Sequence, residues 1–337
     1  MKRLLLSITA LLLTTVMAVA MAQGEYPWQP TQPITIIVPW AAGGSTDQMT
    51  RIVAGEIEDE LGVSVVVVNQ PGASGSIGTA NALNAPKDGY TWAAGAIRDV
   101  GTYPVLGMLD TSAADWHLYF AVANTGVVGA NPRTPYEDFG DLLEAMRENP
   151  GEISVATAGL SSAGHTVMEQ IAQAADLEYR HVPYDGGNPA VIATVAGETD
   201  ITTQLAVEQA EMIRGKRIRP LAAYSDQPLV IEGYGEIPPI TNWLPDMQIP
   251  MNYFGIWAPK GIPDEVVETM NMVWENRIQD SEALRNYAQS RGALFTPIYG
   301  EEAYQDSLSS IAHQAWTLYD GGKAVIEPSE VGIPRPE

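Results

Sequence analysis

The chain has 337 residues, no cysteine, 45% hydrophobic residues and a formal net charge of −23 at pH 7. This length and composition suffice for two hydrophobic cores, and they exclude a disulfide-stabilised scaffold and a lipid anchor on cysteine. The large acidic excess repels nucleic acids and anionic membrane surfaces, so neither is expected as a partner.

The first 22 residues have the pattern of an export signal. Two basic residues precede an apolar stretch at residues 4–19, and residues 20–22 read AMA, the small-x-small sequence that a signal peptidase needs. No later stretch approaches the roughly 18 apolar residues that span a bilayer. We therefore expect cleavage near Ala22 and a mature protein in the periplasm.

Apolar, β-branched segments alternate with segments of helical period along the remaining chain, which is typical of βαβ units on a largely parallel sheet. The expected strands are residues 34–38, 63–68, 90–94, 125–130, 153–156, 178–182, 200–204, 219–223 and 253–258. The expected helices are residues 48–61, 76–84, 136–149, 163–175, 263–280, 281–291 and 301–320, with two more beginning at Asn188 and Val207. Residues 228–250 are rich in proline, glycine and aromatic residues, and are expected to form a long connection.

These elements predict two α/β domains, each a mostly parallel sheet flanked by helices. We expect domain I to contain residues 23–124 and 250–337, and domain II to contain residues 125–249. The C-terminal part contributes a single expected strand, too little for a third sheet, and therefore completes domain I. A cleft between two such domains, with strand C-termini and helix N-termini pointing into it, suits a small molecule.

The junction after the first strand is a candidate for ligand binding. Residues 39–47 read PWAAGGSTD and lead directly into a helical segment. Gly43 and Gly44 can turn backbone N–H groups toward a ligand, and the three residues after them can cap the helix. A helix N-terminus carries unpaired donors and partial positive charge, which suit a carboxylate. The alternative is an ordinary strand-to-helix turn that contains two glycines.

Six segments match the motifs of one family, in order and over essentially the whole mature chain. They are YPWQPTQPITIIVPWAAGGSTD (26–47), VNQPGASGSIG (68–78), PKDGYT (86–91), TAGLSSAGH (157–165), HVPYDGG (181–187) and APKGIP (258–263). On these motifs the chain resembles the periplasmic solute receptors of tripartite tricarboxylate transporters, which are also called Bug receptors.

The resemblance implies a type II periplasmic binding protein whose two domains close like a flytrap. It implies a receptor that has no enzymatic activity and no cofactor, and that captures a di- or tricarboxylate or an aromatic acid for a membrane permease. An amino acid remains an alternative ligand, and a sensing receptor of the same fold remains an alternative role. We expect a monomer.

The resemblance also implies which positions bind the ligand, on two loops that face each other across the cleft. The first-domain positions are Ala41, Ala42, Gly43, Gly44 and Asp47. The second-domain positions are Ala158, Gly159, Ser161, Ser162 and His165. In the family, the backbone N–H groups, hydroxyls and bridging waters of these loops hold the ligand carboxylate.

Some positions depart from the family pattern and bear on ligand choice. Trp40 replaces the usual Phe before A-A-G-G and brings a wider ring with an indole donor. Gln204 stands where the family commonly has an acid, so a repelling charge is replaced by an amide that donates and accepts. The rings of Trp40, Tyr184 and Trp257 suit a flat ligand, or else they belong to the core or the cleft wall.

Arg98 follows the expected strand at residues 90–94, at an end that should point toward the cleft. A guanidinium there would bind a carboxylate through two parallel hydrogen bonds and would favour a ligand with two carboxylates. The alternative, slightly favoured, is an ion pair with Asp99 or another surface acid.

A hydrolase and a metal enzyme are weaker alternatives. Ser162 and His165 lie three residues apart along one helix face, and the sequence has no G-x-S-x-G elbow. His165 is better explained as a helix N-terminal residue whose ring is satisfied by a backbone group. The four histidines, at positions 117, 165, 181 and 313, lack the spacing of metal ligands, so no metal site is expected.

Overall fold

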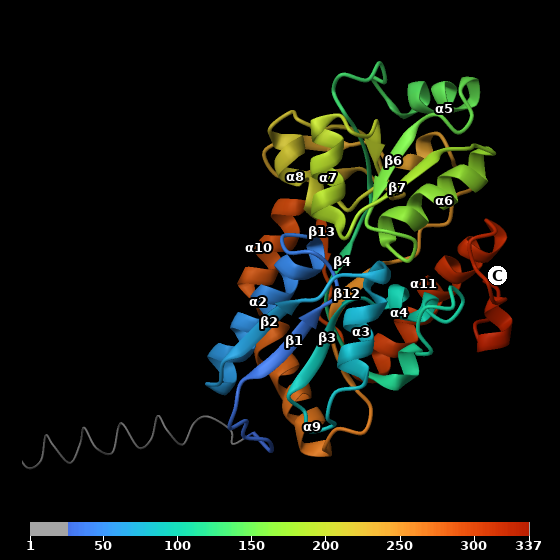
Figure 1. Ribbon diagram of the computed structural model, residues 1–337. Helices are drawn as coiled ribbons and strands as arrows, with labels where there is room; N and C mark the ends of the chain where they lie inside the picture. Colours follow the sequence, from blue (N-terminus) through green and yellow to red (C-terminus); the bar gives the residue numbers. More distant parts are fainter. Residues whose placement is uncertain (1–25, 337) are drawn as a thin grey trace, which may run out of the picture.

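The computed structural model describes residues 26–336, which form two lobes that each contain a β-sheet covered by helices (Figure 1). The export signal expected at residues 1–22 lies outside the described residues. None of the helices within 26–336 combines the length and the apolar character that a bilayer crossing requires.

The larger sheet has six strands in the order β13-β4-β12-β3-β1-β2. The strands are β1 (Ile34–Val38), β2 (Val65–Asn69), β3 (Thr91–Ala96), β4 (Trp116–Asn124), β12 (Tyr253–Pro259) and β13 (Ala293–Phe295). The helices of this lobe are α2 (Ser45–Leu61), α3 (Ser76–Leu83), α4 (Ile97–Thr102), α9 (Asp264–Val273), α10 (Glu282–Arg291) and α11 (Gly300–Asp320). Two adjacent residues of β3 belong to different cores. Trp92 packs in the core that contains Trp274, and Ala93 packs in the core that contains Trp257. Both faces of the sheet are therefore buried, as the continuous apolar strands require.

The smaller sheet has five strands in the order β7-β6-β8-β5-β9. The strands are β5 (Val127–Ala130), β6 (Ser154–Thr157), β7 (Arg180–Pro183), β8 (Ile201–Thr202) and β9 (Arg219–Ala223). Its helices are α5 (Phe139–Glu148), α6 (Ala163–Ala175), α7 (Gly187–Ala196) and α8 (Ala206–Arg214). The chain enters this sheet between β4 and β5 and returns to the larger sheet at β12. This strand membership supports residues 125–249 as domain II, and we retain that division as a proposal.

The two-domain α/β class is confirmed, and most strands of each sheet run in one direction, with antiparallel strands among them. In the larger sheet β1 pairs in parallel with β2 and β3, whereas β12 runs antiparallel to β3 and β4. In the smaller sheet β5 runs antiparallel to β8 and β9. Strands β5 and β12 run antiparallel to their neighbours because they belong to the connections between the domains. Strand β5 follows the entry of the chain into domain II, and β12 follows its return to domain I.

Several elements were not predicted from the sequence. Helix α4 and strand β4 fill the gap left between residues 94 and 125, and β13 is a second strand in the C-terminal part. The long connection contains a small hairpin, β10 (Leu229–Ile231) with β11 (Gly235–Ile237). The helix expected at residues 263–280 is α-helical only to Val273 and continues as a π-helical turn at Trp274–Ile278.

Candidate binding site between the two domains

Loops of domain I that follow β1 and β2 contact loops of domain II that follow β7 and β6, and these contacts hold the domains together in a closed arrangement. Ala41 N–H donates to the Asp185 carbonyl oxygen (3.0 Å), and Leu160 N–H donates to Ser74 Oγ (3.1 Å). Ser161 Oγ in turn donates to the Ser74 carbonyl oxygen (2.7 Å). The φ of Gly159 is +112°, and a Cβ there would lie 2.5 Å from Ser74 Oγ, so glycine is required for this close approach.

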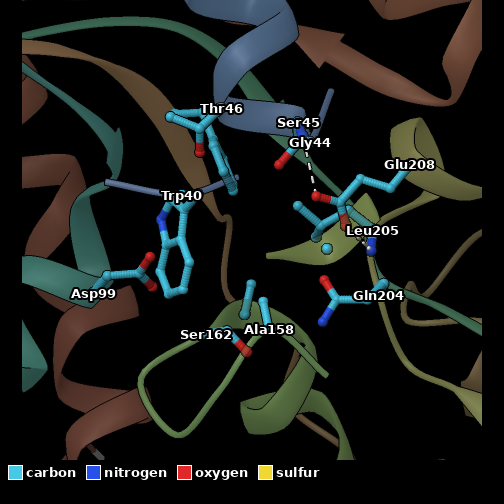
Figure 2. A pocket seen from close by; sticks show the side chains of 13 residues that line it. Trp40, Gly44, Ser45, Thr46, Asp99, Ala158, Ser162, Gln204, Leu205 and Glu208 are labelled. Carbon is cyan, nitrogen blue, oxygen red and sulfur yellow. Dashed lines mark hydrogen bonds between the residues drawn. The ribbon is translucent and has the colours of Figure 1, made fainter. Parts of the chain in front are cut away.

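A pocket with a cavity volume of about 30 Å³ lies between these loops in this closed arrangement (Figure 2). It is lined from domain I by Trp40, Gly44, Ser45, Thr46, Asp99 and Phe254, and from domain II by Ala158, Ser162, Ala163, Gly187, Gln204, Leu205 and Glu208. Five of the predicted site residues therefore meet in one pocket, namely Trp40, Gly44, Ala158, Ser162 and Gln204.

The N-terminus of α2 forms one wall of this pocket. Gly44 is its N-cap residue and provides no side-chain cap. Ser45 N–H donates across the domain boundary to Glu208 Oε1 (3.0 Å). Within the described chain the N–H groups of Thr46 and Asp47 have no acceptor. Two donors of the first helical turn thus remain free for an anion.

Asp47 does not line the pocket, because its carboxylate is used inside domain I. It accepts hydrogen bonds from Gly43 N–H (2.9 Å), from Asn69 Nδ2 (3.0 Å) and from Arg51 Nη2 (2.8 Å). Burial alone would raise the pKa of Asp47, but these hydrogen bonds and the Arg51 charge lower it below its usual value. Asp47 therefore fixes the loop that carries Gly43.

Ser162 contributes the N-cap of α6 on the opposite wall. Its Oγ donates to the Gly159 carbonyl oxygen (2.7 Å) and accepts from His165 N–H (3.3 Å). The hydroxyl therefore shapes the loop and the helix start before any ligand arrives.

Ser162→Ala is expected to lower the free energy of unfolding by about 1 kcal/mol, because it removes this cap. Ser162→Gly is the control, since glycine replaces a capping serine at a cost of only a few tenths of a kcal/mol. Urea denaturation of both variants tests the prediction. Equal losses for alanine and glycine would contradict a capping role.

Gln204 and Glu208 form a buried polar pair on the domain II wall. In the amide orientation that satisfies both atoms, Gln204 accepts from Ala158 N–H (2.7 Å) and donates to Glu208 Oε2 (2.9 Å). Glu208 Oε2 also accepts from Leu205 N–H (3.2 Å), the start of its own helix. Burial raises the pKa of Glu208, although the hydrogen bonds from Ser45 and Leu205 oppose the shift. A Cβ at Gly187 would lie 2.1 Å from Glu208 Oε1, so only glycine leaves room for this carboxylate.

Asp99 and Arg98 lie on α4, and only Asp99 lines the pocket. The expected surface ion pair of Arg98 is wrong, because Arg98 is 2% exposed and forms no salt bridge within residues 26–336. Burial lowers the pKa of Arg98, although the nearby Tyr224 and Asp99 oppose this. Burial raises the pKa of Asp99 to about 7, although the Arg98 charge opposes this.

His165 lies behind the loop and not in the pocket. Its Nδ1 hydrogen-bonds the Leu160 carbonyl oxygen (2.9 Å), which confirms that a backbone group satisfies the ring. Its Nε2 lies 3.3 Å from Glu169 Oε1, and the ring stacks on His181 with centroids 4.2 Å apart. The ring forms no hydrogen bond with Ser162 Oγ in the described part of the chain. Over residues 26–336 no three acidic or histidine side chains gather into a metal-binding group.

The remaining predicted residues lie around the pocket. Ala41, Gly159 and Ser161 belong to the interdomain contacts, and Ala42 is exposed in the turn. Tyr184 is half-buried, and its hydroxyl approaches Glu198 (3.4 Å). Trp257 belongs to a core of domain I and is 1% exposed.

Sequence reasoning missed several residues that line the pocket. Thr46 and Ser45 were considered only as caps, and Asp99 only as a partner for Arg98. One sequence pattern could have indicated the position of Glu208. This pattern is the capping box, in which an acid three residues after the N-cap accepts a hydrogen bond from the N-cap backbone N–H. The N-cap is Leu205 and not Ser or Thr, so the usual pattern is absent.

The fold and the pocket define a two-domain α/β binding protein with a small-molecule pocket between its domains. The family model of the tripartite tricarboxylate transporter family receptor matches residues 49–296, and the chain belongs to this family. As a receptor of this family it is a solute-binding protein and not an enzyme.

Individual proteins agree with this assignment. A protein of Pseudomonas sp. strain P51, encoded between tcbD and tcbE, is 34% identical over 251 residues, which cover 72% of each chain. The structure of a periplasmic transporter is 27% identical, covers 86% of this chain and 96% of its own, and has a TM-score of 0.76. The structure of R. palustris Rpa4515 with adipate is 24% identical, covers 87% and 98%, and has a TM-score of 0.79.

Proposed function

We propose that this receptor captures a carboxylate-bearing small molecule in the periplasm and delivers it to a membrane permease of the tripartite tricarboxylate type. The observation that supports this most is the interdomain pocket, which is lined by Thr46 of the first turn of α2, a turn in which the N–H groups of Thr46 and Asp47 have no acceptor among residues 26–336. The adipate in the similar protein Rpa4515 supports a carboxylate as the ligand class.

Hinge closure is the proposed mechanism. The acid binds first at the α2 wall in an open form, and domain II then rotates to enclose it and exclude water. Closure is driven by the higher affinity of the acid for the closed form. A ligand that contacts only one domain binds both forms equally well and does not shift the equilibrium toward the closed form. The pocket walls come from both domains, as this mechanism requires.

A thermal-shift screen of the dialysed mature protein tests the function. We expect at least one carboxylic acid to stabilise the protein, by about 2.7 kcal/mol when present at 100 times its Kd. The matched control is the primary amide of the same acid, which should not stabilise. Equal shifts for acid and amide, or no shift with any acid, would contradict the proposal.

A further inference from the structure

The pocket of this proposed anion receptor is itself acidic. Asp99 enters from domain I and Glu208 from domain II, on opposite sides of the view in Figure 2. No lysine or arginine lines the pocket in the described part of the chain. A ligand with several carboxylates would face two buried acids without a compensating cation.

Glu208 already occupies part of the anion site. Its two oxygens accept hydrogen bonds from the N-termini of two helices, α2 through Ser45 and α8 through Leu205. The Gln204 amide adds a third donor in its satisfied orientation. A ligand carboxylate cannot use Ser45 N–H without displacing this carboxylate, so Glu208 takes a position that a second ligand carboxylate would need.

Asp99 has the opposite arrangement, because one of its two carboxylate oxygens, Oδ1, lacks a donor. The side chain is nearly inaccessible, with 4% of the residue exposed, and it borders the pocket beside Trp40 (Figure 2). Its Oδ1 has no hydrogen-bond partner in the described part of the chain, and the neighbouring Arg98 does not pair with it. A buried acceptor without a donor is costly, and a site built in this way discriminates strongly in favour of ligands that bring one.

Donors for a single carboxylate remain elsewhere in the pocket. Thr46 lines the pocket, and its N–H group and that of Asp47, the next residue in the first turn of α2, have no acceptor in residues 26–336. The Trp40 indole N–H and the Thr46 hydroxyl also form no hydrogen bond within the described chain, and both residues line the pocket. The walls thus offer donors for one carboxylate and an acceptor for one donor.

We propose that the pocket selects a small acid with one carboxylate and one hydrogen-bond donor, a hydroxyl or an ammonium group, and that Asp99 accepts from that donor. Acids with two carboxylates and no donor are excluded by Asp99 and Glu208. This inference rests on the proposed function and specifies its ligand class.

Matched four-carbon acids test the inference. Titration calorimetry at pH 8 measures the Kd of butyrate, succinate, 3-hydroxybutyrate and 3-aminobutyrate. The hydroxy acid, the amino acid or both should bind at least tenfold more tightly than butyrate and succinate. The comparison between the hydroxy and the amino acid identifies which donor Asp99 takes.

Asp99→Asn provides the second test. Asparagine removes the negative charge and replaces one acceptor oxygen with an amide donor, so the preference for the donor-bearing acid over succinate should fall at least tenfold. Asp110→Asn, at an exposed position of the same domain, is the control and should leave the preference unchanged. A melting curve of each variant confirms folding.

The outcomes separate this inference from the proposed function. Tighter binding of succinate than of the donor-bearing acids overturns the inference and leaves a carboxylate receptor. An unchanged preference in Asp99→Asn also overturns it. Failure of all four acids together with the larger acids of the screen contradicts both.

Discussion

Glu208→Ala is expected to lower the free energy of unfolding by roughly 2 to 4 kcal/mol, one of the two largest effects predicted here. The carboxylate is buried and accepts from Ser45 N–H, from Leu205 N–H and from the Gln204 amide. Its removal leaves these donors unpaired and breaks a direct hydrogen bond between the domains. Urea denaturation followed by tryptophan fluorescence measures the loss.

Two further variants make this prediction specific. Glu211→Ala lies on the same helix but removes a surface ion pair with Arg214, and is expected to cost about 1 kcal/mol or less. Ser45→Pro removes the donating N–H at the first helical position of α2, where proline is tolerated and the preceding Gly44 is already extended. The double variant Ser45→Pro/Glu208→Ala should cost less than the sum of the single variants. Additive losses would show that the two residues do not interact.

Asp99→Asn is expected to raise the free energy of unfolding of the ligand-free protein at pH 8, by up to about 4 kcal/mol. Burial raises the pKa of Asp99 to about 7, whereas an unfolded aspartate has a pKa of about 4. Between these values the native protein keeps a proton that the unfolded chain releases, so the wild type loses stability as pH rises from about 4 to about 7. Asparagine does not titrate and avoids this loss.

Denaturation curves at pH 5, 6, 7 and 8 measure this effect. The advantage of Asp99→Asn over the wild type should grow with pH up to about 7 and then level off. Asp110→Asn, at an exposed position, should show no such growth. A constant difference between Asp99→Asn and the wild type at every pH would mean that Asp99 is already paired in the native state.

The architecture was largely predictable because strong local patterns determine it. Strand β1, helix α6 and strand β9 occur at their expected bounds, since apolar runs and helical periodicity are local properties of the sequence. Strand β4 was missed because the apolar run that forms it does not alternate, and such a run fits a buried helix equally well. The antiparallel course of β12 depends on a long excursion through domain II, which no local pattern records.

The binding site was only partly predictable, for a related reason. The motif positions Trp40, Gly44, Ala158, Ser162 and Gln204 do line one pocket. Sequence reasoning could not find the contact of Glu208 with Ser45, because it joins residues 163 positions apart on two domains.

Arg98 and Asp99 illustrate the same limit. The end of β3 was expected to point toward the cleft, but the short helix α4 that follows was not foreseen. This helix places Asp99 in the pocket wall and buries Arg98 outside it, so the ion pair expected between the two residues does not form.

The most direct test of the account is a crystal structure of the mature protein with the acid that binds most tightly in the screen. We expect the acid inside the interdomain pocket, with its carboxylate at the first turn of α2 beside Thr46 and with contacts to both domains. An acid bound outside this pocket, or one that contacts a single domain of an open protein, would contradict it.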